Sequence, residues 1–481
     1  MNNSLNLEPQ NVFGFFEQLA KIPRGSGNTK EVSDYLANFA KERGLTYYQD
    51  DNNNIIIIKE ASVGYEASEP IIIQGHIDMV LDQTSTCTKD LNKEGLDLYV
   101  DGDFLKAKDT TLGGDDGIAV AYALALLDDD SLCHPRLEAV FTSDEETTML
   151  GVQTIDVSPL KGHILLNIDS DEDGVFLTSS AGGCEIDVTI PVKRTGKQGT
   201  LLTISMEGLL GGHSGAEINK ERVNSAKLSA RLLWDLERDV DYQLVSFEAG
   251  SKHNIIARTA TVAILVDTNE VSAVCESIRK NVDIYKEEYR TSDPDLKVNV
   301  AKEEGQYEVL DPTSQRKVMM YLYHTPFGVQ YMSTEIENLV ETSVNVGIVS
   351  LKEDELYVCS SVRSSVTTRR ESVFRQIQSL GEFLGGEVEI TDSYPAWQYN
   401  PESTIRSLIM DTYKDLFHED ARMEAVHAGL ECGYFNEKIK DLDCVSFGPT
   451  NYDIHSTKER LSISSTQKYW KFLVELLKRA K

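Results

Sequence analysis

The stretch that decides the fold of this chain is an apolar run that ends in a histidine and an aspartate, Ile71-Ile72-Ile73-Gln74-Gly75-His76-Ile77-Asp78. Its pattern predicts a buried strand with polar side chains at its carboxyl end. Side chains alternate between the two faces of a strand, so His76 and Asp78 project to the same side. The aspartate can then hold one imidazole nitrogen while the other nitrogen binds a metal ion. A polar pair at the surface is the alternative interpretation.

The segments around this strand predict further helices and strands. Apolar positions recur at helical spacing between residues 8 and 43, on both sides of a turn at 23–27. Strands are expected at 54–58, 137–142 and 164–168, and a helix at 117–127. Strands that alternate with helices indicate an α/β domain with a mainly parallel sheet, and ligand sites in such domains gather at the carboxyl ends of the strands.

The pattern changes after Gly182-Gly183 to longer strands of alternating polarity, separated by amphipathic helices. This pattern of strands and helices predicts an inserted α+β domain. Two of its stretches, 208–216 and 341–347, each combine a strand-forming run with adjacent polar residues. An internal duplication is therefore one interpretation of this domain. The helix and strand alternation returns after Gly385-Gly386. We therefore expect one domain formed from residues 1–183 and 389–481, with a second domain inserted at 184–388.

The net charge of the chain is −31, from 47 basic and 78 acidic residues. Such a surface repels phosphate backbones and anionic lipid, so we expect no nucleic-acid partner and no membrane partner. The longest apolar stretch, 117–127, is too short to span a bilayer. The polar first residues lack the features of a signal peptide, which favours a cytoplasmic protein.

Seven cysteines are spread along the chain without a close pair. This odd number argues against a disulfide framework, and the spacing argues against a zinc site made of thiolates. Any metal site must therefore use histidine and carboxylate ligands.

Further acidic residues follow other apolar runs of the first domain, namely Asp115, Glu145, Glu146 and Asp169. Because the carboxyl ends of parallel strands meet at one edge of a sheet, we expect these side chains to converge. His455 lies where the first domain returns. The alternatives are an N-cap role for Asp115, solvated loop positions for the two glutamates and a surface position for His455.

Four more motifs complete a resemblance to a known family. They are Ile22-Pro23-Arg24-Gly25-Ser26-Gly27, Gly211-Gly212-His213-Ser214-Gly215, Val362-Arg363-Ser364-Ser365 and His427-Ala428-Gly429-Leu430-Glu431-Cys432-Gly433. With these motifs the chain resembles, over essentially its whole length, the zinc aminopeptidase-like family that includes carnosinases, aminoacylases and carboxypeptidase G. The resemblance implies a catalytic first domain and an inserted lid domain.

The resemblance also implies two zinc ions and a role for each residue of the centre. By this likeness His76 and Asp169 hold one ion, Glu146 and His455 hold the other, Asp115 bridges them, Asp78 orients His76 and Glu145 is the general base. Imidazole and carboxylate ligands suit zinc, with Co²⁺ or Mn²⁺ as substitutes. The sequence departs from the family at Asp116, where many members have asparagine.

Candidates in the inserted domain follow from the same resemblance. His213 is expected to stabilise the oxyanion, in its own chain or in a partner subunit, unless it is a turn residue. Arg363 suits a clamp on the terminal carboxylate of a peptide, with a structural ion pair as the alternative. The remaining substrate-binding candidates, which could instead be structural, are Asn254 before a predicted strand and, beyond the inserted domain, the residues of a glycine-containing loop, His427, Gly429 and Glu431.

The function that the resemblance implies is dipeptide hydrolysis by a dinuclear zinc enzyme. The expected substrates are short peptides, including Xaa-His dipeptides such as β-alanyl-histidine, and a homodimer is compatible with the sequence. One alternative is an N-acyl-amino-acid deacylase with the same metals. A second alternative is a non-catalytic binding protein with a relic site, although the complete ligand set argues against it.

Overall fold

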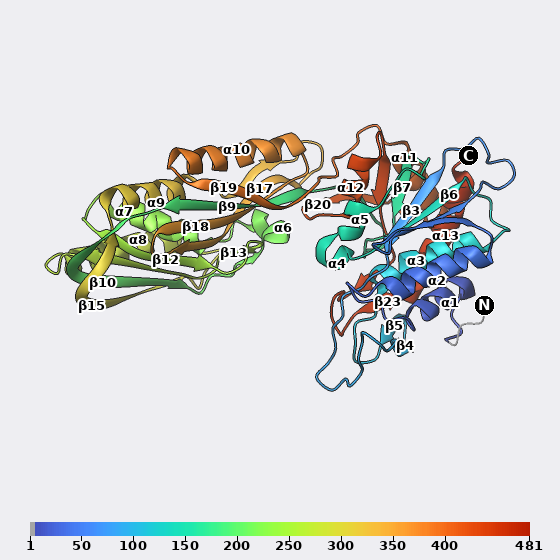
Figure 1. Cartoon of the computed structure of the whole chain (residues 1–481), viewed down its shortest axis with the longest axis horizontal. Coiled ribbons are helices and arrows are strands. Elements are labelled where there is room, and N and C mark those ends of the chain that lie inside the picture. Colours follow the sequence, from blue (N-terminus) through green and yellow to red (C-terminus); the bar gives the residue numbers. More distant parts are fainter. Residues whose placement is uncertain (1–4) are drawn as a thin grey trace. The chain divides into compact units, whose positions relative to one another are not determined.

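The computed structural model describes residues 5–481, which form two compact units (Figure 1). Unit 1 comprises the described residues up to Ser179 together with Tyr399–Ala425 and Leu430–Lys481. Unit 2 comprises Ser180–Gln398 and Val426–Gly429. Unit 2 is therefore inserted into the sequence of unit 1.

Unit 1 is built on an eight-stranded sheet with the order β1-β2-β6-β3-β7-β21-β8-β20. Its strands are β1 (Thr46–Gln49), β2 (Ile55–Lys59), β3 (Ile71–His76), β6 (Leu137–Thr142), β7 (Ile164–Asn167), β8 (Val175–Ser180), β20 (Arg422–Val426) and β21 (Asp443–Ser446). The central strands β6, β3, β7 and β21 are parallel, as predicted for an α/β domain. Every residue of β2, β3 and β6 is buried, which explains why their sequences are nearly continuous apolar runs.

The helices of unit 1 supply the rest of its core. They are α1 (Gln10–Leu19), α2 (Lys30–Glu42), α3 (Gly114–Asp128), α4 (Glu145–Thr148), α5 (Leu150–Thr154), α11 (Thr404–Phe417), α12 (Glu431–Lys438) and α13 (Ile463–Arg479). The apolar stretch Gly117–Leu127 of α3 is buried on all sides, as expected for a helix without a polar face. A smaller sheet joins β22 (Asn451–Tyr452), β23 (Arg460–Ser462), β5 (Phe104–Ala107) and β4 (Leu98–Asp101) in that order.

Unit 2 is built on a nine-stranded antiparallel sheet with the order β15-β10-β14-β12-β17-β18-β9-β19, with β16 paired to β17. Its strands are β9 (Gly182–Pro191), β10 (Arg194–Glu207), β12 (Gln243–Gly250), β14 (Ala260–Val266), β15 (Lys297–Leu310), β16 (Gly328–Met332), β17 (Val340–Leu351), β18 (Glu355–Ser364) and β19 (Glu387–Tyr394). A two-stranded ladder joins β11 (Gly212–His213) to β13 (Ile255–Ile256).

The helices of unit 2 are α6 (Ser214–Glu217), η1 (Ile218–Lys220), α7 (Ser225–Leu236), α8 (Val271–Glu288), α9 (Pro312–His324) and α10 (Thr367–Phe383). The four long helices α7, α8, α9 and α10 share one apolar core with the strands. This arrangement is the α+β architecture that alternating strands and amphipathic helices predicted.

The sheet of unit 2 extends past residue 388, where we expected the insertion to end. Gly385 and Gly386 form the turn between α10 and β19 instead of a domain boundary. β19 pairs with β9 and is an edge strand of the unit 2 sheet, so the second unit continues to Gln398. Residues 389–398 therefore belong with the inserted unit.

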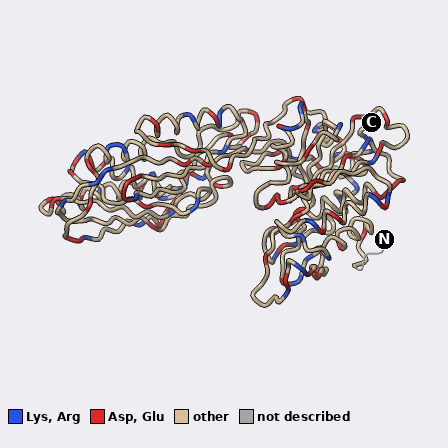
Figure 2. Tube along the Cα trace, viewed as in Figure 1, with Lys and Arg blue, Asp and Glu red and all other residues tan. Residues whose placement is uncertain are grey.

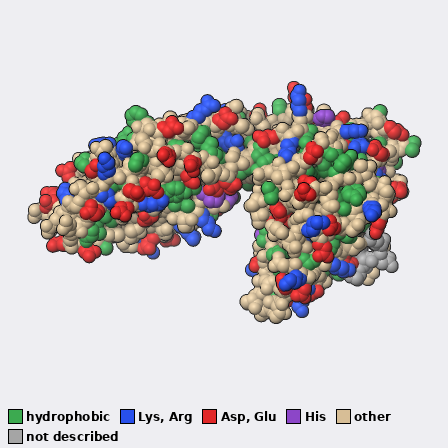
Figure 3. Space-filling model, in the orientation of Figure 1, with side chains coloured by type: hydrophobic (Ala, Val, Ile, Leu, Met, Phe, Trp, Pro, Cys, Tyr) green, Lys and Arg blue, Asp and Glu red, His purple; other side chains and the backbone are tan. Residues whose placement is uncertain are grey.

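Charged residues of both signs are distributed along both units (Figure 2). On the face drawn in Figure 3, hydrophobic side chains lie in small groups between charged ones. None of the helices in the described part of the chain combines the length and the apolar character needed to cross a bilayer.

Candidate metal centre and substrate-binding residues

The parallel strands of unit 1 deliver acidic and imidazole side chains to one edge of the sheet. His76 is the last residue of β3, and its register partner Thr142 is the last residue of β6, shortly before Glu145. Asp169 follows the end of β7, which pairs with β3 in the same direction. The structure therefore brings together the residues that the sequence placed at successive strand ends.

Asp115 lies between two histidines that are distant in sequence. Its Oδ1 is 3.0 Å from Nε2 of His76, and its Oδ2 is 3.1 Å from Nε2 of His455. Each carboxylate oxygen thus faces a different imidazole. A carboxylate placed in this way can bridge two metal ions.

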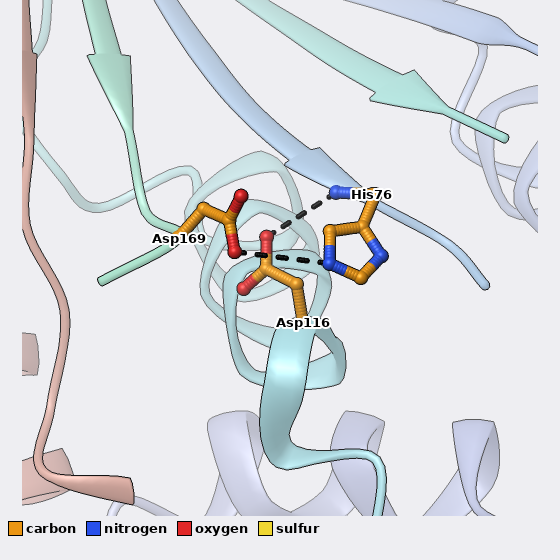
Figure 4. Close-up of side chains that lie close together, drawn as sticks. All are labelled: His76, Asp116 and Asp169. Atoms are coloured by element: carbon orange, nitrogen blue, oxygen red, sulfur yellow. Dashed lines mark hydrogen bonds and ion pairs between the residues drawn. The ribbon is translucent and has the colours of Figure 1, made fainter. Parts of the chain in front are cut away.

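Each histidine has its own set of acidic neighbours. Nε2 of His76 is 3.7 Å from Oδ1 of Asp169, and these residues converge with Asp116 (Figure 4). Nε2 of His455 is 2.9 Å from Oε2 of Glu146, and these residues group with Asp115. A third group joins His76 to Glu145 and Glu146, so the assignment of each ligand to one ion stays a prediction.

Asp78 supports both His76 and the start of α4. The Asp78 side chain is fully buried, with Oδ1 at 3.3 Å from Nδ1 of His76. It also accepts hydrogen bonds from the hydroxyl of Ser26 at 2.8 Å and from the backbone N–H groups of Glu145 and Glu146. Burial alone would raise the pKa of Asp78, but the hydrogen bonds from His76 and Ser26 hold the pKa below its ordinary value. Asp78 therefore fixes an imidazole and the helix turn that carries two further site residues.

Asp116 takes the place of the asparagine that many family members have. Its side chain is buried, and Oδ2 accepts a hydrogen bond from the backbone N–H of His76 at 3.2 Å. Burial and the neighbouring charge of Asp115 raise the pKa of Asp116 well above its ordinary value. The residue thus adds one more acidic group beside the strand end.

The electrostatics of this cluster call for positive charge. Burial and the carboxylates around it, Glu431 first among them, raise the pKa of Glu145 to about 8 against a smaller opposing effect of His76. Hydrogen bonds to Asp115 and Glu146 raise the pKa of His455 to about 10. Glu146 Oε1 is buried without a hydrogen-bond partner in the described structure. Several buried carboxylates with an orphaned oxygen are costly unless cations neutralise them, so the donor set fits divalent metal ions such as zinc.

Left-handed backbone conformations occur on both segments that carry Glu146 and His455. Asp144, next to Glu145, has φ +54°, and His455 has φ +58°. Such conformations cost of order 1–3 kcal/mol for residues other than glycine and are frequent at functional sites. These conformations occur at His455 itself and at the residue that precedes α4, the helix that carries Glu145 and Glu146.

His213 belongs to unit 2, where it ends β11. Its Nδ1 accepts a hydrogen bond from the backbone N–H of Gly215 at 3.2 Å. Burial and the positive charge of Arg363 lower the pKa of His213, so the ring is neutral. A neutral ring that accepts at Nδ1 carries its proton on Nε2, which makes Nε2 a hydrogen-bond donor.

Arg363 lies at the end of β18 in unit 2, with its side chain 9% exposed. Its Nη1 donates to the hydroxyl of Tyr394 at 2.8 Å, and its Nε is buried without a partner in the described structure. No carboxylate of residues 5–481 forms an ion pair with this guanidinium. The structural ion pair that was the alternative for Arg363 is therefore not what the structure contains.

Two other candidates of unit 2, His427 and Gly429, lie next to residues that neighbour Arg363. His427 Nε2 is 2.7 Å from Oγ of Ser343, the register partner of Arg363. A Cβ atom on Gly429 would lie 2.8 Å from the ring of Tyr394, so only glycine allows this approach. Asn254 Oδ1 is buried without a hydrogen-bond partner in the described residues.

Glu431 is placed differently from the loop position that its motif suggested. It begins α12 in unit 1 and is fully buried. Its Oε2 accepts hydrogen bonds from Gln74 at 2.5 Å and from Thr142 at 2.7 Å. Glu431 thus lies behind the strand ends β3 and β6, and a direct contact with substrate stays a prediction.

Sequence reasoning missed several residues that support these side chains. Ser26 and Arg24 were noted only as parts of a family motif, and nothing in the sequence singled out Ser343, Tyr394 or Glu459. A polar residue between two glycines, such as Ser26, was the one available signal. The contacts of the other residues depend on segments that are distant in sequence.

The chain is similar over almost its whole length to proteins of known sequence or structure. Cytosol non-specific dipeptidase of Escherichia coli (strain K12) is 33% identical over 480 residues, which cover 99% of each chain. The crystal structure of aminoacylhistidine dipeptidase from Vibrio alginolyticus matches with a TM-score of 0.94 and 32% identity over 98% of this chain and 96% of that one. Aminopeptidase PepT from Bacillus cereus, at 13% identity, shares the fold with a TM-score of 0.59 over 98% of this chain and 99% of that one.

The family assignment rests on a match that spans most of the chain. Residues 72–479 match the profile of Peptidase family M20/M25/M40. This range includes every metal-ligand candidate from His76 to His455. The chain therefore belongs to peptidase family M20/M25/M40.

Proposed function

We propose that this metal-dependent dipeptidase holds two zinc ions and hydrolyses short peptides, including Xaa-His dipeptides such as β-alanyl-histidine. The observation that carries the proposal is the position of Asp115, whose two oxygens face His76 and His455 separately. Two histidine-carboxylate sets that share one aspartate favour a dinuclear centre over a single ion. The relatives named as dipeptidases support the choice of substrate class.

The ligand roles follow the closest contacts of the two histidines. His76 and Asp169 would hold one ion, His455 and Glu146 the other, and Asp115 both. Bound zinc ions would polarise the peptide carbonyl and lower the pKa of water. Cobalt or manganese could replace zinc, since both accept imidazole and carboxylate ligands.

Glu145 is the residue that we assign to proton transfer. Its Oε2 lies 4.0 Å from Nε2 of His76, and its backbone N–H is held by Asp78. The neighbouring Glu146 faces His455 instead, so the two consecutive glutamates are divided between base and ligand. Glu145 would take a proton from the attacking water and return it to the leaving amine.

We assign recognition of the substrate to unit 2. The Nε2–H of His213 would donate to the oxygen that becomes negative as the carbonyl is attacked. The guanidinium of Arg363, which lacks an ion-pair partner in the described structure, would bind the terminal carboxylate. Asn254, His427 and Gly429 are the further substrate-binding residues of this proposal.

Hydrolysis of a substrate panel by the zinc-loaded protein tests the proposal. The panel contains Xaa-His dipeptides, other dipeptides, tripeptides and N-acyl amino acids. We expect dipeptides with a free amine and a free carboxylate to be cleaved with the highest kcat/KM. Faster hydrolysis of N-acyl amino acids than of dipeptides would indicate a deacylase instead. If other dipeptides were cleaved but no Xaa-His dipeptide was, the proposed Xaa-His specificity would be wrong.

Two further features belong to this proposal. The relative named as a cytosolic enzyme supports a cytoplasmic location. A homodimer is the assembly that we propose for the chain. Size-exclusion chromatography with light scattering checks it, since a mass of one chain at micromolar concentration would contradict it.

A further inference from the structure

The carboxylate of Glu459 is buried in a cradle of backbone N–H groups next to the metal centre. The side chain is 3% exposed. Oε2 accepts from Leu112 at 2.7 Å and Gly113 at 3.0 Å, and Oε1 accepts from Gly114 at 2.8 Å and Asp115 at 3.3 Å. The side-chain amide of Asn451 donates to Oε1 as well, at 3.0 Å. The four backbone donors are the consecutive residues that end at the proposed bridging ligand.

Arg24 holds the same turn through its carbonyl groups. Its buried guanidinium donates through Nη2 to the carbonyl oxygen of Gly113. Through Nη1 it donates to the carbonyl oxygens of Ile77 at 3.1 Å and Asp78 at 2.9 Å. Arg24 therefore joins the turn before Asp115 to the segment that follows His76.

The turn itself is built for these two contacts. Gly113 has φ +65°, and a Cβ atom on it would lie 2.5 Å from Nη2 of Arg24. A Cβ atom on Gly114 would lie 2.8 Å from the amide nitrogen of Asn451. Two glycines thus let the guanidinium of Arg24 and the side-chain amide of Asn451 approach the backbone closely.

The position of Glu459 in the sequence gives this cradle its significance. Glu459 lies four residues after His455 in a turn closed by its own N–H, which donates to the carbonyl oxygen of Ser456 at 3.1 Å. The carboxylate therefore ties the turn that carries His455 to the turn that carries Asp115. Hydrogen bonds from the N–H groups alone would only satisfy the free donors at the start of α3. The connection to the His455 turn additionally fixes Asp115 relative to His455.

We propose that Glu459 and Arg24 are positioning residues that set the place of Asp115 between His76 and His455. The inference rests on the proposed function, because it takes Asp115 as the ligand shared by two metal ions. Loss of the cradle would let the Asp115 turn move and would weaken both metal sites, although neither positioning residue belongs to a candidate ligand group of the described structure.

The test compares two buried glutamates of unit 1. Glu138 in β6 is also fully buried, and it accepts hydrogen bonds from the backbone N–H groups of Lys161 and Gly162 and from Arg136. It lies at the opposite end of the strand from the metal centre, as its register partner is Ile72. Glu138→Gln therefore controls for the general cost of losing a buried, backbone-binding carboxylate.

Metal-free wild type, Glu459→Gln and Glu138→Gln are titrated with Zn²⁺ by calorimetry, and with Co²⁺ by visible absorption, after the folded state of each has been checked by circular dichroism. We expect the affinity of Glu459→Gln for Zn²⁺ and for Co²⁺ to be about tenfold lower or more, and the absorption spectrum of its Co²⁺ form to differ from that of the wild type. Glu138→Gln should bind with wild-type affinity at comparable loss of thermal stability. With saturating zinc, Glu459→Gln should lose kcat while KM changes little.

The outcomes separate this inference from the function on which it rests. The positioning role would be overturned if Glu459→Gln bound zinc with wild-type affinity, or if Glu138→Gln lost zinc affinity to the same extent. In either case, binding of two zinc ions by the wild type would still support the proposed function. A wild type that binds no metal would overturn both. If Glu459→Gln does not fold, Arg24→Lys decides, because a single ammonium cannot reproduce the fork that reaches three carbonyls. Weaker metal binding by Arg24→Lys supports the inference, and unchanged binding contradicts it.

Discussion

Nε2 of His455 lies 3.1 Å from Oδ2 of Asp115, a contact between residues that are 340 positions apart in the sequence. The opposite oxygen of the same carboxylate faces His76. One side chain thus connects the two ends of unit 1 at the metal centre. The ligand roles proposed for the neighbouring residues depend on this connection.

Substitution of Asp115 should affect both metal ions, whereas substitution of Asp169 should affect one. Asp115→Ala removes the oxygen that faces each histidine, so we expect the purified variant to lose both equivalents of zinc. Asp169→Ala should keep the ion held by His455 and Glu146. Elemental analysis after dialysis measures both. One retained zinc in Asp115→Ala would show that this residue is not shared.

Substitutions of the adjacent residues Glu145 and Glu146 should have different effects on metal content and kcat. Glu145→Gln should keep near-normal metal content and lower kcat by a factor of about 10² or more, because it removes the proton acceptor. Glu146→Ala should lose metal, because Oε2 of Glu146 faces His455. Zinc content and steady-state kinetics are measured on the same preparations. Equal zinc loss in both variants, with Glu145→Gln still active, would reverse the assignment.

Arg363→Ala should weaken the recognition of a free terminal carboxylate. We expect kcat/KM for a dipeptide to fall about 10-fold to 100-fold, the range for a lost hydrogen bond to a charged group. The same dipeptide with an amidated terminus should be cleaved equally by variant and wild type. Arg369→Ala is the matched control, because Arg369 already pairs with Glu341 at 2.7 Å. An equal loss for both substrates would contradict a carboxylate clamp.

The stability of the protein should depend on pH through His427. Burial, with the positive charge of Arg363, lowers the pKa of this imidazole to about 3 in the folded state. The unfolded chain takes up a proton near pH 6.5 and the folded chain does not, so the contribution of His427 to stability is lost as pH falls below 6.5. Between pH 7.5 and 5.5 the wild type should lose about 1.4 kcal/mol more than His427→Gln. Urea unfolding at both pH values measures the difference, and parallel losses in the two proteins would exclude this effect.

The elements that carry the metal ligands could be predicted because their burial is visible in the sequence. β3 and β6 are buried along their whole length and therefore appear as apolar runs, and the polar residues that follow them mark the edge of the sheet. The shared orientation of these strands then predicts that His76 and Glu145 converge. What pattern alone leaves open is the choice of Asp115 over Asp116 as the shared ligand, for which the resemblance was needed.

Other features depended on contacts that no local pattern contains. The glycine pair at 385–386 has the composition of a linker, but β19 beyond it pairs with β9, which lies about 200 positions earlier in the sequence. Glu431 stands in a glycine-containing motif that is typical of a loop, and its burial follows from hydrogen bonds to Gln74 and Thr142. The duplication suggested for the inserted domain stays a prediction.

The central claim is that two metal ions held by this chain are required for peptide hydrolysis. The most direct measurement is a zinc titration of the chelated, metal-free protein, with bound zinc and dipeptidase activity followed on the same samples. We predict negligible activity without metal, recovery as zinc is added, and full activity at two zinc ions per chain, in line with the two histidines that face separate oxygens of Asp115. Undiminished dipeptide hydrolysis by protein that elemental analysis shows to be free of metal would contradict the account.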